Sequence, residues 1–183
     1  MRFEPTPIAS VTVIHAEPQS DERGSFARSY CAETFRAAGL TFGAVRQASI
    51  SHNRRRGSLR GMHWQAEPKP EGKLVRVTAG RIYDVVLDLR PQSATYLRWF
   101  ARELDAVAND AVLIPPGCAH GFLTLEDDSV VSYMMDADFD AASARGVRWD
   151  DPAFAIAWPF HPELMSERDR TWPDYRPECA PSS

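Results

Sequence analysis

The sequence predicts an all-β chain that folds as a sandwich, a jelly roll or a barrel. Ten short segments have strand character, because β-branched and aromatic residues recur in them, often alternating with polar ones. Turn signals such as Ala79-Gly80 and Asp127-Asp128 separate some of these segments. Helical signals are limited to two short stretches. Many short strands joined by turns are typical of closed or two-layered β folds.

The elements follow from local patterns along the chain. The expected strands are residues 10–15, 25–30, 44–51, 58–65, 73–78, 82–89, 96–104, 111–114, 121–125 and 129–137. Residues 31–38, followed by Gly39, are expected to form a short helix, and residues 166–170 a single further turn. The strands at 73–78 and 82–89 flank the Ala79-Gly80 turn, so we expect them to pair as a hairpin.

Composition indicates one ordinary globular domain over residues 1–183, with an irregular, proline-rich tail from about residue 172. A net charge of −4, with residues 54–56 as the only basic run, argues against a nucleic-acid surface. Three scattered cysteines form no disulfide framework and fit a reducing compartment. We find no signal peptide and no apolar run long enough to cross a membrane, so we expect a cytoplasmic protein.

Three chemically active side chains lie on apolar strand faces. Because strand side chains alternate, His63 is expected to face the same side as Leu59, Gly61 and Gln65. By the same rule Lys73 accompanies residues 75 and 77, and Tyr133 accompanies residues 131 and 135. A polar group that points into an apolar interior must have a hydrogen-bond partner there or serve a function such as binding or catalysis. Each residue could instead have only a structural role. His63 could be an isolated structural histidine, Lys73 could extend its ammonium group to solvent, and Tyr133 could simply hydrogen-bond a neighbour through its hydroxyl.

A metal site is not expected. Pro115, Gly117 and His120 match the spacing of the second half of a cupin metal motif, but His63 is followed by Trp64-Gln65, without a nearby third ligand. The carboxylates of Asp84 and Asp88 are expected to be solvated or paired with arginines.

Eight short motifs follow one another along the chain: DERGSF at 21–26, LRGMHWQ at 59–65, GKLVRV at 72–77, DVVLDLR at 84–90 with Ser93 and Thr95, IPPGCAHGF at 114–122, GVRWDDP at 146–152, IAWP at 156–159 and SERD at 166–169. In these motifs and in their order the chain resembles the dTDP-4-dehydrorhamnose 3,5-epimerase family of cupin-type nucleotide-sugar epimerases. No single motif is decisive, but eight in order are highly specific. The resemblance implies a cupin-type jelly roll, no cofactor, no metal, and a homodimer in which an N-terminal strand crosses to the partner.

The resemblance also implies a reaction and its residues. The family removes a proton next to the keto group of a nucleotide-linked 4-keto-6-deoxy sugar and returns a proton to the opposite face. The base corresponds to His63, the acid that orients it to Asp169, the cation near the keto oxygen to Lys73, and the proton donor to Tyr133. The residues that match substrate-binding positions are Arg23, Phe26, Arg28, Gln47, Ser49, Arg60, His120, Phe139 and Arg168.

Four positions depart from the family pattern. Arg28 and Ala144 stand where the family has glutamates, Ser49 where it has an asparagine, and Phe139 where it has a tyrosine that stacks on thymine. A guanidinium only donates hydrogen bonds, whereas a carboxylate accepts them, so a base other than thymine is one hypothesis. The alternatives left open are a mono-epimerase or keto-isomerase on a CDP- or GDP-linked sugar, a non-catalytic ligand-binding cupin, and a metal-dependent cupin oxygenase.

Overall fold

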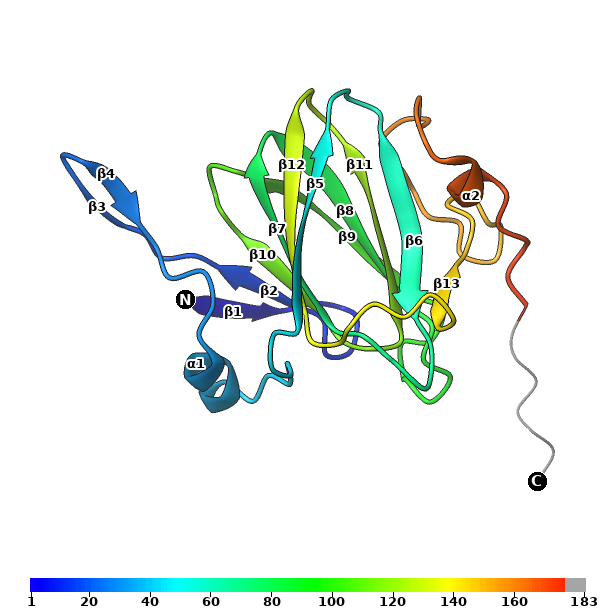
Figure 1. The fold of residues 1–183 in the computed structure, drawn as a ribbon, viewed down its shortest axis with the longest axis horizontal. Helices are drawn as coiled ribbons and strands as arrows, with labels where there is room; N and C mark the ends of the chain where they lie inside the picture. The colour runs from blue at the N-terminus through cyan, green and yellow to red at the C-terminus, as the bar shows by residue number, and fades with distance from the viewer. Residues whose placement is uncertain (177–183) are drawn as a thin grey trace.

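The computed structural model describes residues 1–176, which form two facing β-sheets and two short helices (Figure 1). The all-β jelly-roll prediction is confirmed. Among the described residues, no helix has the length and apolarity needed to span a membrane. Cys179 and the rest of 177–183 lie outside the described residues; residues 172–176 contain no helix or strand.

The first sheet has six strands and the second has five. The first sheet, in spatial order, contains β1 (Arg2–Pro5), β2 (Thr12–His15), β10 (Ala111–Ile114), β7 (Lys73–Ala79), β12 (Ser129–Met135) and β5 (Gln47–Asn53). The second contains β13 (Ala144–Gly146), β6 (Leu59–Gln65), β11 (Cys118–Thr124), β8 (Arg81–Asp88) and β9 (Trp99–Asp105). All pairings within the two sheets are antiparallel.

A separate two-stranded ribbon extends away from the body. Its strands are β3 (Gln19–Asp21) and β4 (Gly24–Phe26), and every residue in both strands is exposed. Figure 1 shows the ribbon at the far end of the molecule from helix α2 (Glu167–Arg170). Helix α1 (Ala32–Ala37) follows the ribbon and buries Phe35 against the outer face of the first sheet.

The main core lies between the sheets and follows from strand alternation. Val75 and Val77 on β7 meet Ile82 and Val86 on β8 in one cluster of buried side chains. Alternate residues of β8, including Val85, lie in a second cluster on the outer face of the second sheet. Because both faces of β8 are covered, residues 85–87 are apolar on either face of the strand.

The predicted hairpin between residues 73–78 and 82–89 is wrong. Strand β7 pairs with β10 and β12, whereas β8 pairs with β11 and β9 in the other sheet. Gly80 has φ +70°, and a Cβ there would lie 2.5 Å from Ser129 Oγ, so the turn requires glycine. The turn therefore carries the chain from one sheet to the other, which places Lys73 opposite the second sheet.

Other strand boundaries also differ from the predictions. The strand expected at residues 25–30 ends at Phe26, while β1, β3 and β13 were not predicted. These three strands have only three or four residues each, too few to show a periodicity.

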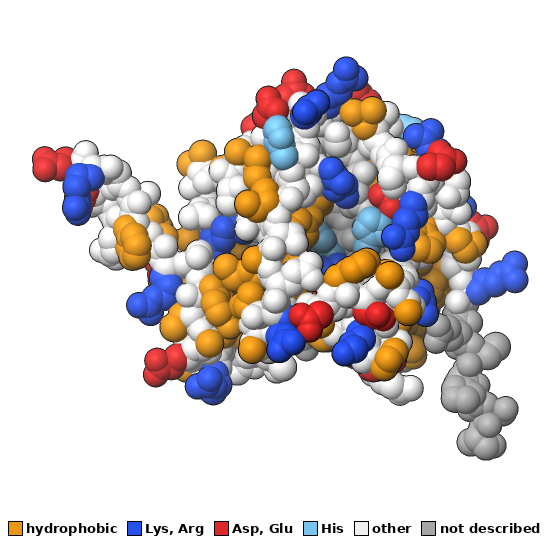
Figure 2. Space-filling model, viewed as in Figure 1, with side chains coloured by type: hydrophobic (Ala, Val, Ile, Leu, Met, Phe, Trp, Pro, Cys, Tyr) orange, Lys and Arg blue, Asp and Glu red, His pale blue; other side chains and the backbone are white. Residues whose placement is uncertain are grey.

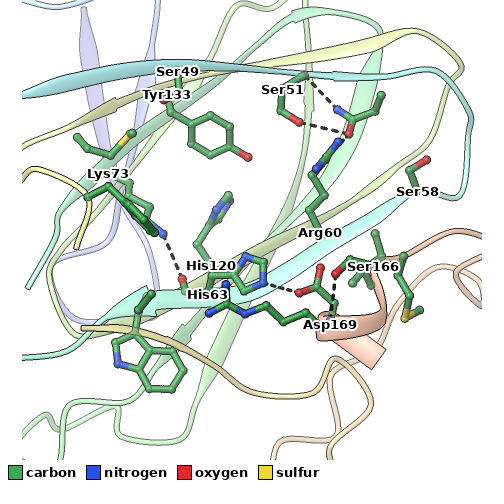
Figure 3. A pocket seen from close by; sticks show the side chains of 18 of the residues that line it. Ser49, Ser51, Ser58, Arg60, His63, Lys73, His120, Tyr133, Ser166 and Asp169 are labelled. Atoms are coloured by element: carbon green, nitrogen blue, oxygen red, sulfur yellow. Dashed lines mark hydrogen bonds and ion pairs between the residues drawn. The ribbon is translucent and has the colours of Figure 1, made fainter. Parts of the chain in front are cut away.

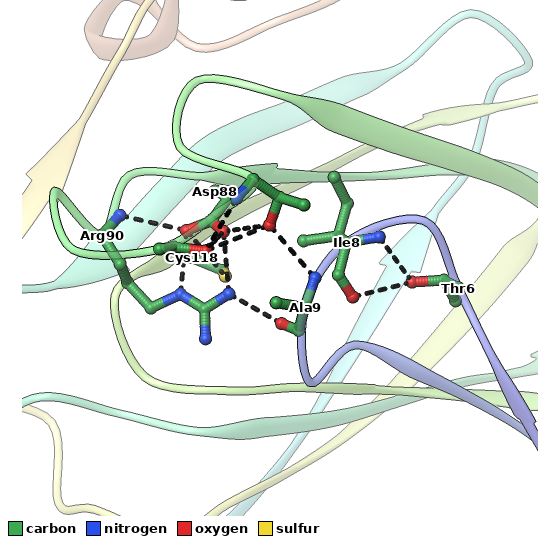
Figure 4. Close-up of polar contacts among 8 residues, drawn as sticks. Thr6, Ile8, Ala9, Asp88, Arg90 and Cys118 are labelled. Carbon is green, nitrogen blue, oxygen red and sulfur yellow. Dashed lines mark hydrogen bonds and ion pairs between the residues drawn. The ribbon is translucent and has the colours of Figure 1, made fainter.

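A buried network around Asp88 joins the turn between β1 and β2 to the loop after β8 (Figure 4). The Asp88 carboxylate accepts hydrogen bonds from Arg90, Ser93 and Thr95, at 2.5–3.0 Å. Arg90 Nη2 donates to Ala9 O at 2.7 Å, and Ala9 N donates to Thr95 Oγ1 at 3.1 Å. The network therefore fixes the N-terminal strands, which lead into the ribbon, on the jelly roll.

Candidate active site

An open cavity of about 800 Å³ is lined by residues from both sheets, from α2 and from the segment before it. Figure 2 shows the hollow in the face of the molecule, with histidine atoms inside it and basic side chains around it. His63 and His120 come from the second sheet, whereas Lys73 and Tyr133 come from the first. The structure thus places all four in one cavity.

His63 and Asp169 form an ion-pair geometry at one wall of the cavity (Figure 3). His63 Nε2 lies 2.6 Å from Asp169 Oδ1, and the Asp169 side chain is 5% exposed while that of His63 is 40% exposed. Asp169 is held by α2, because Ser166 caps this helix and its Oγ accepts from Asp169 N at 3.1 Å.

Asp169 remains ionised in this environment. Burial tends to raise its pKa, but the hydrogen bond and charge of His63, with hydrogen bonds from Ser166 and the Gly61 backbone, hold the pKa below its usual value. An ionised carboxylate only accepts hydrogen bonds, so Nε2 of His63 carries the proton and the lone pair of the neutral ring is on Nδ1.

A β-bulge in β6 brings Arg60 to the same side as His63. His63 pairs with His120 and Arg60 pairs with Phe122, so β6 uses one more residue than β11 between these two pairs. Strict alternation from the sequence placed Gly61 beside His63, and that expectation is wrong at this point. Gly61 instead lies against the backbone of the neighbouring strand β11, and a Cβ on Gly61 would be 2.4 Å from Gly121 Cα.

Lys73 reaches into the cavity from the start of β7. Its Nζ donates to His63 O at 3.1 Å and lies 3.2 Å from Glu71 Oε1. Burial lowers the pKa of Lys73, and the attraction of Glu71, with a smaller contribution from Asp84, only partly offsets this. The predicted face is confirmed, because Val75 and Val77 accompany Lys73 toward the interior.

Tyr133 lies on the opposite side of the cavity from His63, and Figure 3 shows its hydroxyl pointing into the space between them. Its ring meets the edge of His120 with centroids 5.9 Å apart. Burial, and then the nearby Asp84 charge, raise its pKa, so the phenol is protonated. A protonated phenol can donate a proton to a reacting carbon.

His120 is held by a carboxylate that the sequence left unassigned. His120 Nε2 lies 2.7 Å from Asp84 Oδ1, and both side chains are buried. The expectation that Asp84 and Asp88 are solvated or paired with arginines is therefore wrong for Asp84 and right for Asp88, which pairs with Arg90. Strand alternation alone gave no signal for the Asp84 pair, because the partner is on a different strand.

Five of the predicted binding residues line the cavity together with His120. They are Gln47, Ser49, Arg60, Phe139 and Arg168. Gln47 Oε1 accepts from Phe139 N at 3.1 Å, and Phe139 is 63% exposed. Arg168 lies over the ring of Trp172. Ala144 also lines the cavity, so three of the four positions that depart from the family pattern, Ser49, Phe139 and Ala144, line it.

Three predicted binding residues do not line this cavity. Arg23 and Phe26 belong to the exposed ribbon, and Arg28 follows it. Arg23 pairs with Asp21 of the same ribbon, and Phe26 is 77% exposed. Within one chain these residues are therefore separate from His63 and Lys73.

Several cavity residues were missed by the sequence reasoning. Asn53 accepts from Arg60 Nε at 2.7 Å, and its own amide donates to Ser51 O and Ser129 O. Glu71 was also missed, although its position two residues before Lys73 is a signal that an extended chain places both on one side. Within residues 1–176, no group of three or more histidine, cysteine, aspartate or glutamate side chains has a metal-binding arrangement.

The chain matches the family described as dTDP-4-dehydrorhamnose 3,5-epimerase over residues 5–176. A dTDP-4-dehydrorhamnose 3,5-epimerase of Sinorhizobium fredii is 39% identical over 94% of this chain and 89% of the relative. A dTDP-4-dehydrorhamnose 3-epimerase of Streptomyces niveus is 36% identical over 93% of this chain and 82% of the relative.

Solved structures show the same similarity. The crystal structure of a dTDP-4-dehydrorhamnose 3,5-epimerase from Bacillus anthracis, with TDP and PPi bound, aligns with a TM-score of 0.91 and 34% identity. The alignment covers 95% of this chain and 99% of that chain.

Proposed function

The chain belongs to the dTDP-4-dehydrorhamnose 3,5-epimerase family, and from this we propose that it epimerises a nucleotide-linked 4-keto-6-deoxy sugar of the dTDP type. The proton next to the keto group is removed by a base, and a proton returns from the opposite face. The observation that carries the proposal is the convergence of His63 and Tyr133 on opposite sides of one cavity.

His63 is the proposed base. Its pairing with the buried Asp169 supports this role, because the carboxylate fixes the ring with a lone pair on Nδ1 and stabilises the imidazolium formed by proton uptake. Tyr133 is the proposed donor to the other face, supported by its protonated state and by its free hydroxyl, which has no hydrogen-bond partner among residues 1–176.

Lys73 is the proposed stabiliser of the enolate. Proton removal places negative charge on the keto oxygen, and a fixed cation there is favourable only as that charge develops. The contact of Lys73 with the backbone of His63 supports this role, because it keeps the ammonium group next to the proposed base.

Sugar and nucleotide binding are assigned to the remaining cavity residues and to the ribbon. Arg60 and Arg168 offer donors to the sugar and diphosphate, and His120, whose Nε2 faces Asp84, offers Nδ1 as an acceptor to a sugar hydroxyl. Gln47, Ser49 and Phe139 are assigned to the nucleoside. We propose that the site also takes Arg23, Phe26 and Arg28 from a second copy of the chain. An isolated two-stranded ribbon whose strand residues are all exposed is only marginally stable, which supports exchange with a partner.

Deuterium exchange tests the reaction. The protein is incubated with dTDP-4-keto-6-deoxyglucose in deuterated water, and the sugar protons are followed by NMR. Deuterium at carbons 3 and 5, absent with His63→Ala and retained with His161→Ala, would establish a double epimerase; deuterium at one carbon would establish a mono-epimerase. No exchange by the wild type contradicts the proposal.

Calorimetry with dTDP, CDP, UDP and GDP tests which nucleotide the site prefers. If a nucleotide other than dTDP binds more tightly, the proposed substrate becomes a sugar linked to that nucleotide.

Mixing two inactive variants tests the exchanged ribbon. If the ribbon acts on the partner's cavity, a mixed dimer of His63→Ala and Arg23→Ala contains one intact site and regains activity. If it acts on its own cavity, both sites stay defective and mixing restores nothing.

A further inference from the structure

Glu71 is a buried carboxylate inside the cavity. Its side chain is 8% exposed and that of Lys73 is 12% exposed, with Oε1 and Nζ 3.2 Å apart. Burial of two charged groups has a desolvation cost that their attraction offsets only in part, so a buried ion pair in the cavity suggests a role in function. Glu71 precedes Lys73 by two residues, and both side chains face the cavity.

The segment that carries the pair is fixed by Asp136. Gly72 N donates to Asp136 Oδ1 at 2.6 Å, and Asp136 N donates to Gly72 O at 3.3 Å. The second carboxylate oxygen accepts from Gly43 N at 3.2 Å. A Cβ on Gly72 would lie 2.8 Å from Asp136 Oδ2, so a larger residue here would displace that carboxylate. The direction of Glu71 is thus set by the backbone around it.

No other acid is in a position to replace Glu71. Among the described residues, Glu71 is the only carboxylate within 4.0 Å of Lys73 Nζ. The other titratable or charged groups that line the cavity include His63 and Arg60 on β6, His120 on β11, Tyr133 on β12 and Asp169 on α2, and the charge of Asp84 on β8 also acts on Lys73. Asp84 is already paired with His120, and Asp169 with His63. The remaining hydrogen-bond partner of Lys73, the His63 carbonyl, is neutral and does not favour the ammonium form as a carboxylate does.

We propose that Glu71 is a positioning residue that keeps Lys73 charged and directed at the keto oxygen of the substrate. This inference rests on the proposed epimerase function. A sugar that fills the cavity removes water from Lys73, and loss of water favours the neutral amine. The carboxylate counteracts that loss and leaves a cation available when the enolate forms.

The chain contains two lysines, Lys69 and Lys73, which allows a direct test. Lysine labelled with ¹³C at Cε gives two signals, and Lys69 is exposed and serves as an internal reference. In Glu71→Gln, the titration midpoint of Lys73 should move to lower pH while that of Lys69 stays in place. Glu67→Gln, which removes an exposed acid from the same loop, should leave both midpoints unchanged.

Kinetics supply the second readout. The ratio of kcat in Glu71→Gln to kcat in the wild type should fall with rising pH, by about tenfold for each pH unit that the Lys73 midpoint has moved. KM should change less than kcat. Glu71→Asp keeps the charge on a shorter side chain, so it should show a smaller change in the same direction; it replaces Glu71→Gln if circular dichroism shows that variant to be unfolded.

Two results would overturn the inference. One is a Lys73 midpoint that moves no more in Glu71→Gln than in Glu67→Gln, and the other is a kcat ratio that does not depend on pH. Failure of the proposed function is seen separately, as the absence of deuterium exchange by the wild type, while the lysine titration still decides whether Glu71 controls the charge of Lys73.

Discussion

Loss of the Asp88 charge should account for a measurable part of the protein's instability in acid. The side chain is fully buried. Burial by itself would raise its pKa, but hydrogen bonds from Arg90, Ser93 and Thr95 outweigh this and lower the pKa from 3.8 to about 2. A carboxyl group with a depressed pKa in the folded state stabilises the fold above its unfolded pKa, and the stabilisation is lost as the pH falls through the folded pKa.

The size of the effect follows from the two pKa values. The difference between 3.8 and about 2 corresponds to about 2.4 kcal/mol at neutral pH. The same linkage leaves about 1.3 kcal/mol at pH 3 and about 0.4 kcal/mol at pH 2. The difference in free energy of unfolding between wild type and Asp88→Asn should therefore shrink by about 2 kcal/mol from pH 7 to pH 2.

Urea unfolding followed by tryptophan fluorescence at pH 7, 3 and 2 measures this difference. Asp128→Asn is the matched control, because the Asp128 side chain is 76% exposed. That substitution should change the free energy of unfolding by less than about 0.5 kcal/mol at each pH. If the difference in free energy of unfolding between wild type and Asp88→Asn stays constant from pH 7 to pH 2, the reasoning is refuted. Asp88 would then either remain charged at pH 2 or make no contribution to stability through its charge.

Three further substitutions test the site. Asp169→Asn should lower kcat by about 10²–10⁴-fold at unchanged fold, because the amide neither fixes the His63 proton nor stabilises the imidazolium; undiminished turnover would contradict this. Tyr133→Phe should retain deuterium exchange by the base while formation of the epimer falls by at least about 10²-fold, and equal loss of both would argue against a donor role. Gly61→Ala should cost at least about 2 kcal/mol in urea unfolding, because a Cβ would lie 2.4 Å from Gly121 Cα; wild-type stability would show that the backbones can separate.

Strand alternation predicted the orientation of residues wherever the strand is regular. Lys73 faces the interior with Val75 and Val77, and Tyr133 does so with Val131, as their positions require. On β6 the same rule failed at Arg60, because an extra residue in the bulge reverses the alternation there. A bulge depends on pairing with a second strand, so the order of residues on β6 alone does not reveal it.

The all-β class and the family could be predicted from the sequence, because local periodicity and ordered motifs are properties of the linear chain. The same motifs singled out His63, Lys73, Tyr133 and Asp169 as candidate site residues. The partners of these groups follow from the three-dimensional packing. Asp169 lies 106 residues after His63, yet their ring and carboxylate are 2.6 Å apart. Burial, counter-ions and the distance of the ribbon from the cavity arise from the packing of remote segments, and no local pattern along the chain records them.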